Sequence, residues 1–497
     1  MFPTPSCRSR RKEKGILLFI VSVIILILAL GGVSLLLLMR TEHEAALLRS
    51  EELQLTGSVR SAVALIKQIV DLPPDQKKEK GGICDNPALF RNIAIANSQN
   101  GPDTSVSFTI FAPRFNKEKI EGIRFGLVNE STKLNLGALL RWDRESPGTG
   151  KKILMKLPGI TASEADSILD WIDPDENPRD QGAESVWYES QKRPYRPRNA
   201  LPVFLEELLL VRDIERKQLF GSNENRLFDL AAKSESDNDF TLPAGENGEN
   251  EEAIPWNQLL TVFSAEKDLD PNGEPRIDLN EKNLEFLHGE LVRRLDPDLA
   301  NFIIHYRQYG PSKKQNAPAT TSAQKTEKPN FNLPGKFLFR TPLDLVGSAV
   351  LLPNGTRWDS PIPDEEQNAQ KLMHFLDFAS VGESALFFGR ININESSRIV
   401  LECIPGLTDA DVQRILSERP GPDQYGSENF RHSAWIYTKK IVDLEKMKDL
   451  WSKTTSGGDV YRAEIIASLA NRGSGIRAEV VVDSTVNPPR QAFYKEK

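Results

Sequence analysis

The stretch RSRRKEKGILLFIVSVIILILALGGVSLLLLM (residues 8–39) decides the fold, because it places a basic leader directly before a long apolar run. Residues 8–14 carry five basic side chains, and the 24 residues from 16 to 39 carry no charge. At 1.5 Å per residue a helix of this length measures roughly 36 Å, enough to span a bilayer. The basic leader predicts a cytoplasmic N-terminus, with the remainder of the chain on the other side of the membrane.

A cleaved secretory signal is the alternative interpretation of this segment. Its apolar region would be about 7–15 residues long and would end in a small-residue cleavage site. The run at 16–39 is longer and lacks an A-x-A ending, so it favours a membrane anchor.

Helical periodicity continues beyond the apolar run. Apolar residues recur at helical spacing until Pro73-Pro74, at positions Leu48, Leu55, Val59, Ala62, Val63, Ile66 and Ile69. The pattern predicts one helix over residues 16–72, whose outer half packs on a folded domain or on neighbouring helices.

Composition excludes several classes of protein. The chain has 497 residues, enough for two to four domains, and its net charge of −7 argues against a general nucleic-acid binder. Five scattered histidines show no metal spacing, and no catalytic motif is present, so no enzyme is expected. Cys84 and Cys403 could form a disulfide outside the cytoplasm, or Cys403 could be a buried free thiol.

Two strands are predicted near the start of the outer part and two at the end. Residues 104–113 and 121–130 have strand character, and residues 460–483 form apolar strands around a hairpin turn at 471–475. Residues 131–222 are predicted to be mainly helical. Residues 231–253 and 311–329 are polar and of low complexity, which is typical of linkers.

An internal repeat lies between these strands. The stretches KLNLGALL (133–140) with KLPGITASEADSIL (156–169), and RININESSRIVLECIPGLTDADVQRIL (390–416), share a short polar-apolar element and a P-G-[IL]-T turn. GEPRIDLNEKNLEFL (273–287) is a partial copy without the turn. The pattern predicts helix-hairpin-helix packing units.

The first hairpin is strongly acidic, which argues against nucleic-acid binding. Residues 156–184 contain eight acidic and two basic side chains, and phosphate binding would need the opposite balance. Calcium takes carboxylate and carbonyl oxygens, so Asp173, Asp175 and Glu184 are candidate ligands. A solvated acidic loop with Asp173 as a helix cap is the alternative.

A second calcium candidate begins at Asp268, Asp270 and Asn272, which match the opening of an EF-hand loop. The twelfth position is Leu279 instead of Glu, so the bidentate ligand is missing unless Glu281 supplies it. An ordinary Pro-Asn-Gly turn is the alternative interpretation.

The leader and helix resemble those of a type IV prepilin, in which a prepilin peptidase would cut between Gly15 and Ile16. Ile20 occupies the fifth mature position, where most of that family has Glu. This departure is known in the K-type minor pseudopilins of type II secretion (GspK). The sequence resembles that family further in Lys133–Leu136, Leu157–Gly159, the run Asp170–Glu184, Pro194–Pro202 with Asn199, and Glu207–Val211.

The resemblance implies an α+β fold in which a long N-terminal transmembrane helix packs on a small antiparallel sheet, with an inserted helical domain. The corresponding division is a leader (1–15), the helix (16–72), the first sheet part (73–130), a helical domain (131–222), an insert (223–330), a second helical region (331–455) and the final strands (456–497).

The resemblance also implies a function and a location. It implies a structural, single-pass inner-membrane protein with its bulk in the periplasm, which binds calcium and joins I- and J-type minor pseudopilins at the tip of the pseudopilus. A minor pilin of a type IV pilus and a membrane-anchored DNA receptor are the alternatives.

Overall fold

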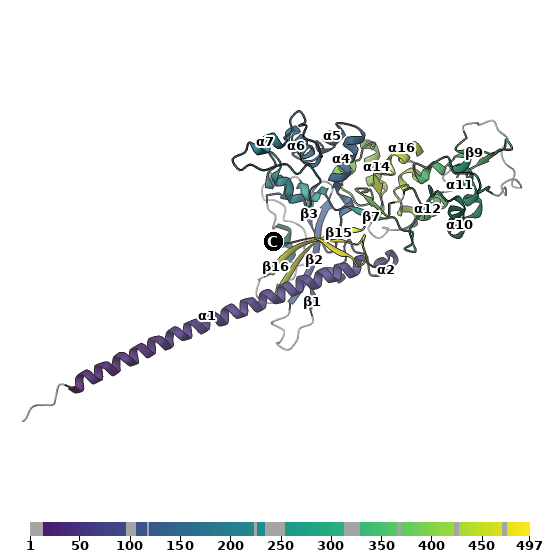
Figure 1. Cartoon of the computed structure of the whole chain (residues 1–497). Helices are drawn as coiled ribbons and strands as arrows, with labels where there is room; N and C mark the ends of the chain where they lie inside the picture. Colours follow the sequence, from purple (N-terminus) through teal and green to yellow (C-terminus); the bar gives the residue numbers. More distant parts are fainter. Residues whose placement is uncertain are drawn as a thin grey trace, which may run out of the picture.

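The structure is a computed structural model that describes residues 13–95, 106–116, 119–222, 226–233, 254–312, 329–364, 369–382, 384–421, 427–469 and 475–497. A long helix leaves a body made of a sheet and many short helices (Figure 1). Most of the two predicted linkers and of the turn at 471–475 lie outside the described residues.

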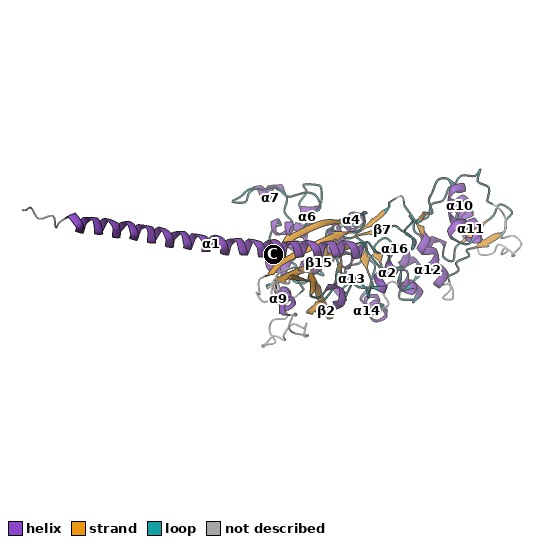
Figure 2. Cartoon of the chain, turned by 90° about the horizontal axis from the view of Figure 1, so that it is seen from below, coloured by secondary structure: helices purple, strands orange, loops and turns teal. Residues whose placement is uncertain are grey.

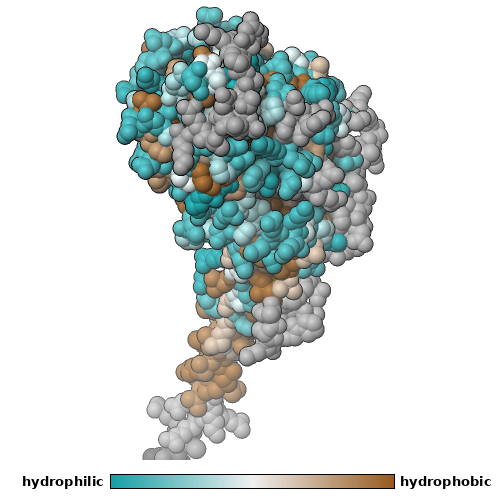
Figure 3. Space-filling view, turned by 90° about the vertical axis from the view of Figure 1, so that its right-hand side faces the viewer, coloured by the Kyte–Doolittle hydropathy of each residue, from teal (hydrophilic) through white to brown (hydrophobic). Residues whose placement is uncertain are grey.

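The N-terminal helix α1 (Glu13–Val70) is continuous from the apolar run into the body. It is the only helix in the described ranges that is long and apolar enough to cross a membrane, and residues 16–39 are exposed. Figure 3 shows these hydrophobic residues gathered on a stalk below the body. The pattern in the sequence begins at Leu48, but the buried stripe begins only at Leu55. Leu48 lies before the body and is 65% exposed.

The stripe of α1 packs on a seven-stranded antiparallel sheet. Its strand order is β1-β2-β15-β16-β17, with β3 paired to β2 and β4 paired to β15. The strands come from both ends of the chain: β1 (Ile93–Ile95), β2 (Val106–Asn116), β3 (Lys119–Arg124), β4 (Val128–Asn129), β15 (Val460–Leu469), β16 (Gly475–Asp483) and β17 (Arg490–Glu496). The α+β class and the two strand pairs predicted from the sequence are confirmed, whereas β17 was not predicted.

Three short helices accompany the sheet: α2 (Pro74–Glu79), α3 (Pro87–Phe90) and α9 (Arg226–Lys233). Phe228 of α9 meets Phe111 of β2 edge to face, with 5.2 Å between ring centroids. Helix α9 therefore extends the apolar core that α1 forms with the sheet. Its last three residues, 231–233, belong to the segment predicted to be a linker.

A buried ionic cluster joins the sheet to the helical domain. Arg462 of β15 contacts Glu130 at 2.8 Å and also Glu479 of β16, while Lys133 lies 3.1 Å from Glu130. Burial alone would raise the pKa of Glu130, but Arg462 and Lys133 lower it to about 2. The charges are thus paired where the chain leaves the sheet at β4.

The helical domain contains three structural repeats, each closed by a two-residue parallel strand pair. The first repeat (133–261) pairs β5 (Leu134–Asn135) with β6 (Leu260–Thr261). The second repeat (276–380) pairs β8 (Ile277–Asp278) with β11 (Ala379–Ser380), and the third (390–455) pairs β13 (Ile391–Asn392) with β14 (Thr454–Thr455). The partial copy found in the sequence is therefore a full structural unit, and the boundary placed at 330 falls inside it.

Each repeat carries a helical hairpin, and one apolar core runs through all three. The hairpins are α5 (Thr149–Leu154) with α6 (Ala162–Ile172), α10 (Leu284–Arg294) with α11 (Pro297–Tyr309), and α13 (Arg398–Glu402) with α14 (Asp409–Glu418). The hairpin of the second repeat lies at the end of the body opposite the exposed part of α1 (Figure 2). In the other two repeats Gly159 and Gly406 make the turn at positive φ, and a capping box follows.

The remaining elements connect these units. They are the helices α4 (Leu136–Glu145), α7 (Ser185–Glu189), α8 (Arg216–Phe220), α12 (Ala369–Phe378), α15 (Trp435–Thr438) and α16 (Leu444–Leu450), and the strands β7 (Ala265–Lys267), β9 (Ala349–Leu351), β10 (Arg357–Asp359) and β12 (Leu386–Phe388).

We expect Ile66→Ala to destabilise the contact between helix and sheet by about 2–4 kcal/mol, because Ile66 is fully buried under the sheet. Leu53→Ala is the matched control on the same helix, since Leu53 is 73% exposed. Native-state hydrogen exchange of the β2 and β15 amides measures the difference. Equal opening free energies in the two variants would contradict the packing described here.

Candidate metal-binding loop

The acidic stretch forms a loop (residues 173–184) between α6 and α7, on the first repeat. Trp171, near the end of α6, precedes the loop. Its side chain is buried in the core, and its indole N–H donates to Glu207 at 3.2 Å. Tyr188 of α7 meets Trp171 edge to face, with 5.2 Å between ring centroids. Both ends of the loop are thereby fixed to one aromatic cluster.

Arg179 lies at the centre of the loop and contacts three carboxylates. Its guanidinium is 3.1 Å from Asp143, 2.7 Å from Asp170 and 2.6 Å from Asp173, and its backbone N–H also donates to Asp170. Burial opposes the charged form of Arg179, but its carboxylate partners raise its pKa. Burial raises the pKa of Asp170 and Asp173, and Arg179 partly offsets this rise.

Several oxygens beside this cluster are buried and have no hydrogen-bond partner among the residues that the structure describes. They are both oxygens of Glu184, Oδ1 of Asp173 and Oδ1 of Asn199. Glu184 is only 4% exposed, and burial together with the charges of Asp170 and Asp173 raises its pKa to about 8. Buried carboxylate oxygens without donors are costly, so these oxygens fit a site that takes up a cation or a proton.

Asp175 is placed differently from the other two predicted ligands. Its side chain is exposed, and hydrogen bonds from Asn177 lower its pKa. Its backbone carbonyl instead faces Asn199, whose Nδ2 donates to it at 3.2 Å. The structure thus directs the carboxylates of Asp173 and Glu184 inward, and the Asp175 side chain outward.

Asn199 was not among the residues predicted to hold a metal. It lies in the left-handed region at φ +51°, and its Nδ2 also donates to Glu176 at 2.8 Å, which leaves Oδ1 free. A non-glycine residue held in this region is often found at a functional site. The only signal for it in the sequence was its place in the P-Y-x-x-x-N motif.

Within the described ranges, no three His, Cys, Asp or Glu side chains are grouped closely enough to hold a metal ion. A cation in this loop would therefore need amide or backbone oxygens beside Asp173 and Glu184. Calcium accepts such mixed oxygen ligands.

The turn at Asp268, Asp270 and Asn272 has its charges already paired. Asp268 lies 3.3 Å from Arg276, and Asp270 lies 3.2 Å from Arg294. Asp270 also accepts the backbone N–H of Asn272 at 2.8 Å, as in an ordinary Asx turn. We therefore make no calcium proposal for this turn.

Cys84 and Cys403 are both free thiols in the structure. Cys403 is fully buried, its S–H faces the carbonyl of Ile153 at 3.8 Å, and burial raises its pKa to about 12. The geometry agrees with the alternative of a buried thiol.

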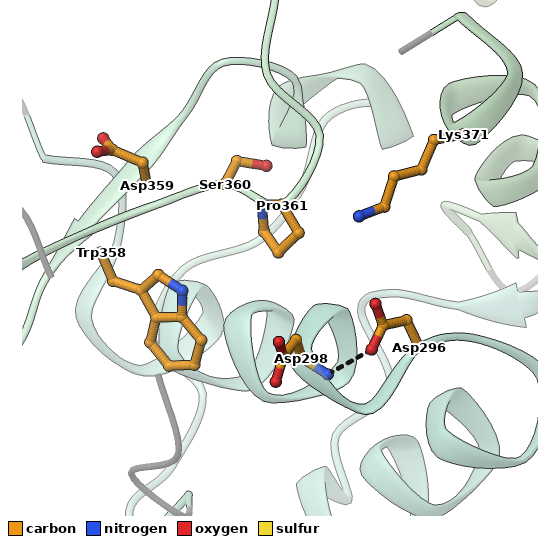
Figure 4. A pocket seen from close by; sticks show the side chains of 7 residues that line it. All are labelled: Asp296, Asp298, Trp358, Asp359, Ser360, Pro361 and Lys371. Atoms are coloured by element: carbon orange, nitrogen blue, oxygen red, sulfur yellow. Dashed lines mark hydrogen bonds between the residues drawn. The ribbon is translucent and has the colours of Figure 1, made fainter. Parts of the chain in front are cut away.

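A cavity of about 280 Å³ lies on the second repeat, between α11, β10 and α12 (Figure 4). Asp296, Asp298, Asp359 and Lys371 line it, and Asp296 caps α11 by accepting the N–H of Asp298 at 3.0 Å. Because these charged side chains are exposed to solvent, we assign no ligand to it.

The fold combines a long helix with an α+β body. The apolar half of the helix lies outside the body and is long and apolar enough to cross a membrane, and the other half packs on the antiparallel sheet. Residues 132–219, which contain the acidic loop, match the family model for type II secretion system (T2SS) protein K. The resemblance found in the sequence is confirmed over this segment.

A chain of the GspK-GspI-GspJ complex from the enterotoxigenic Escherichia coli type 2 secretion system aligns with 9% identity and a TM-score of 0.38, covering 90% of this chain and 98% of that chain. No curated protein matches the sequence.

We expect Gly182→Ala to disorder the acidic loop, because a Cβ there would lie 1.8 Å from Oδ2 of the fully buried Asp170. Such overpacking costs about 1–3 kcal/mol. Gly57→Ala is the matched control, since nothing lies within 4 Å of a Cβ on that exposed face of α1. Hydrogen exchange of residues 170–185 measures the effect, and unchanged protection in Gly182→Ala would contradict it.

Proposed function

We propose that this protein is a non-enzymatic minor pseudopilin of the K type, which sits at the tip of a type II secretion pseudopilus and supports protein export. The match of residues 132–219 to T2SS protein K carries this proposal. The anchor helix and the sheet supply what a pilus-like assembly needs, namely a hydrophobic stalk and a folded head.

The stalk offers a surface for neighbouring subunits. Leu47, Leu48 and Leu53 lie on α1 beyond the apolar span and before the body, and all three are exposed. A helix that exposes leucines outside the lipid is stabilised when another helix covers them. The stalks of I- and J-type minor pseudopilins are the partners we propose.

The N-terminus fits a terminal position in the filament. A prepilin peptidase would cut between Gly15 and Ile16 on the cytoplasmic side, and Ile20 would then be the fifth mature residue. In a growing filament a Glu at that position is thought to pair with the amino terminus of a neighbouring subunit. A subunit at the tip has no neighbour above it, so the carboxylate is dispensable there. The body then lies in the periplasm and the helix in the inner membrane.

The hairpin turns do not favour the DNA-receptor alternative. At the start of α6 the Glu164 carboxylate accepts the N–H of Thr161 at 2.6 Å, and at the start of α14 Asp411 accepts that of Thr408 at 2.7 Å. A carboxylate already occupies each helix N-terminus and repels phosphate. Lys156, beside the first turn, donates to the carbonyl of Glu402 in the third repeat, so the hairpins pack on each other.

Co-expression of the tagged full chain with a prepilin peptidase and I- and J-type pseudopilins tests the function. We expect a detergent-extracted complex of all three pseudopilins, in which N-terminal sequencing finds this chain beginning at Ile16. The matched control replaces the two partners with minor pilins of a type IV pilus. A chain that keeps its leader and purifies alone, or binds only the pilins, would refute the K-type assignment.

We further propose that the acidic loop binds calcium. Asp173 and Glu184 would hold the ion with side-chain oxygens, and Asn199 with Oδ1; these are the buried oxygens without partners. Asp175 would act through the position of its backbone, since its side chain faces Asn177. Bound calcium would supply the positive charge that the buried carboxylates lack and so tie α6 to the loop around Asn199.

Glu184→Gln tests the calcium site, because it removes one charge and keeps the shape of the side chain. For the full chain in detergent, we expect millimolar calcium to raise the thermal unfolding midpoint of the wild type relative to a chelator, with magnesium much less effective. Glu184→Gln should lose this shift. Glu189→Gln, an exposed acid on α7, is the matched control and should keep it. A wild type that does not respond to calcium would overturn this proposal.

A further inference from the structure

Arg179 lies inside the acidic loop and contacts three carboxylates. Its three carboxylate partners come from two helices: Asp143 from α4, and Asp170 and Asp173 from the last turn and the C-cap of α6. Asp170 is fully buried and receives both the guanidinium and the backbone N–H of Arg179. The Arg179 side chain therefore ties the middle of the loop to its first residue, to α6 and to α4.

The other buried acids of the hairpin have partners of their own. Asp166 lies 2.6 Å from Lys151, and Glu164 is bonded to Thr161 and to Gln218. Arg179 takes Oδ2 of Asp173 and leaves Oδ1 of that residue free. The arginine thus determines which oxygens stay available, namely Oδ1 of Asp173 and the carboxylate of Glu184.

We propose that Arg179 is a positioning residue that folds the loop before any ion arrives and reserves Oδ1 of Asp173, beside Glu184, for the cation. This inference rests on the calcium site proposed above. It differs from the simpler view that the ion itself folds an otherwise loose acidic loop. In that view Arg179 would be a surface ion pair, whose loss costs little.

The planar fork of arginine explains why this residue type is needed. The guanidinium reaches three carboxylates in fixed directions, whereas the ammonium of lysine is a single point charge on a flexible stem. Removing one member of a buried ionic group leaves the others uncompensated, and this is strongly destabilising. Arg179→Gln should therefore loosen the loop, and Arg179→Lys should restore part of its order.

Hydrogen exchange of residues 170–185 in the full-length protein in detergent tests the proposal, with calcium chloride or a chelator as the probe condition. In chelator we expect the wild-type loop to be protected and exchange in Arg179→Gln to be faster by roughly tenfold or more. Added calcium should restore much of the protection in Arg179→Gln and change the wild type less. Arg293→Gln is the matched control, because Arg293 also contacts two carboxylates but on the exposed surface.

Each outcome separates this inference from the calcium proposal. If the loop of Arg179→Gln exchanges as slowly as that of the wild type without calcium, the proposed role of Arg179 is wrong, and calcium binding is unaffected by this result. A second outcome is faster exchange in Arg179→Gln that calcium does not slow, together with no calcium effect on the wild type. This result would support the role of Arg179 in folding the loop and would refute the calcium site. If Arg179→Gln does not fold by circular dichroism, Arg179→Lys decides: a loop as protected as in the wild type would refute the need for the fork.

Discussion

The pairing of β15 with β2 and β4 is the constraint on which the rest of this structure depends. It joins strands from the two ends of the chain, and residues 130–459 form one long excursion between them. The entropic cost of closing a loop grows only slowly with its length, so the sheet tolerates a large inserted domain. Arg462, paired with Glu130 and Glu479, stands at the point of closure and couples the sheet to the first residues of the insert.

The insert is built by repetition. Each of three repeats begins with a two-residue strand, forms a helical hairpin and returns to pair in parallel with its own start, and all three share one apolar core. In the first and third repeats the turn of the hairpin faces another part of the protein and carboxylates cap the following helix. Hairpins of this kind, which elsewhere present backbone N–H groups to phosphate, here act as packing units.

The acidic loop shows how the protein concentrates negative charge without unfolding. Arg179 and Lys151 neutralise the acids that stabilise the hairpin, whereas Glu184 and one oxygen of Asp173 lack any donor. Asn199, whose backbone is in the left-handed region, donates from Nδ2 to Glu176 and to the carbonyl of Asp175. The loop therefore contains both paired and unpaired carboxylates, and the match to T2SS protein K covers all of them.

The sequence by itself determined the long apolar helix, its helical stripe, the antiparallel strands and the two hairpins with a P-G-[IL]-T turn, because each depends on local periodicity or turn chemistry. Its candidate ligands Asp173 and Glu184 stay a prediction, although both side chains are buried. Only the tertiary structure decided that the partial copy at 273–287 closes into a full repeat, since β8 and β11 are about a hundred residues apart. It also decided that the Asp175 side chain faces solvent and that its backbone carbonyl accepts a hydrogen bond from Asn199, because the direction of a loop side chain depends on contacts with residues distant in the chain.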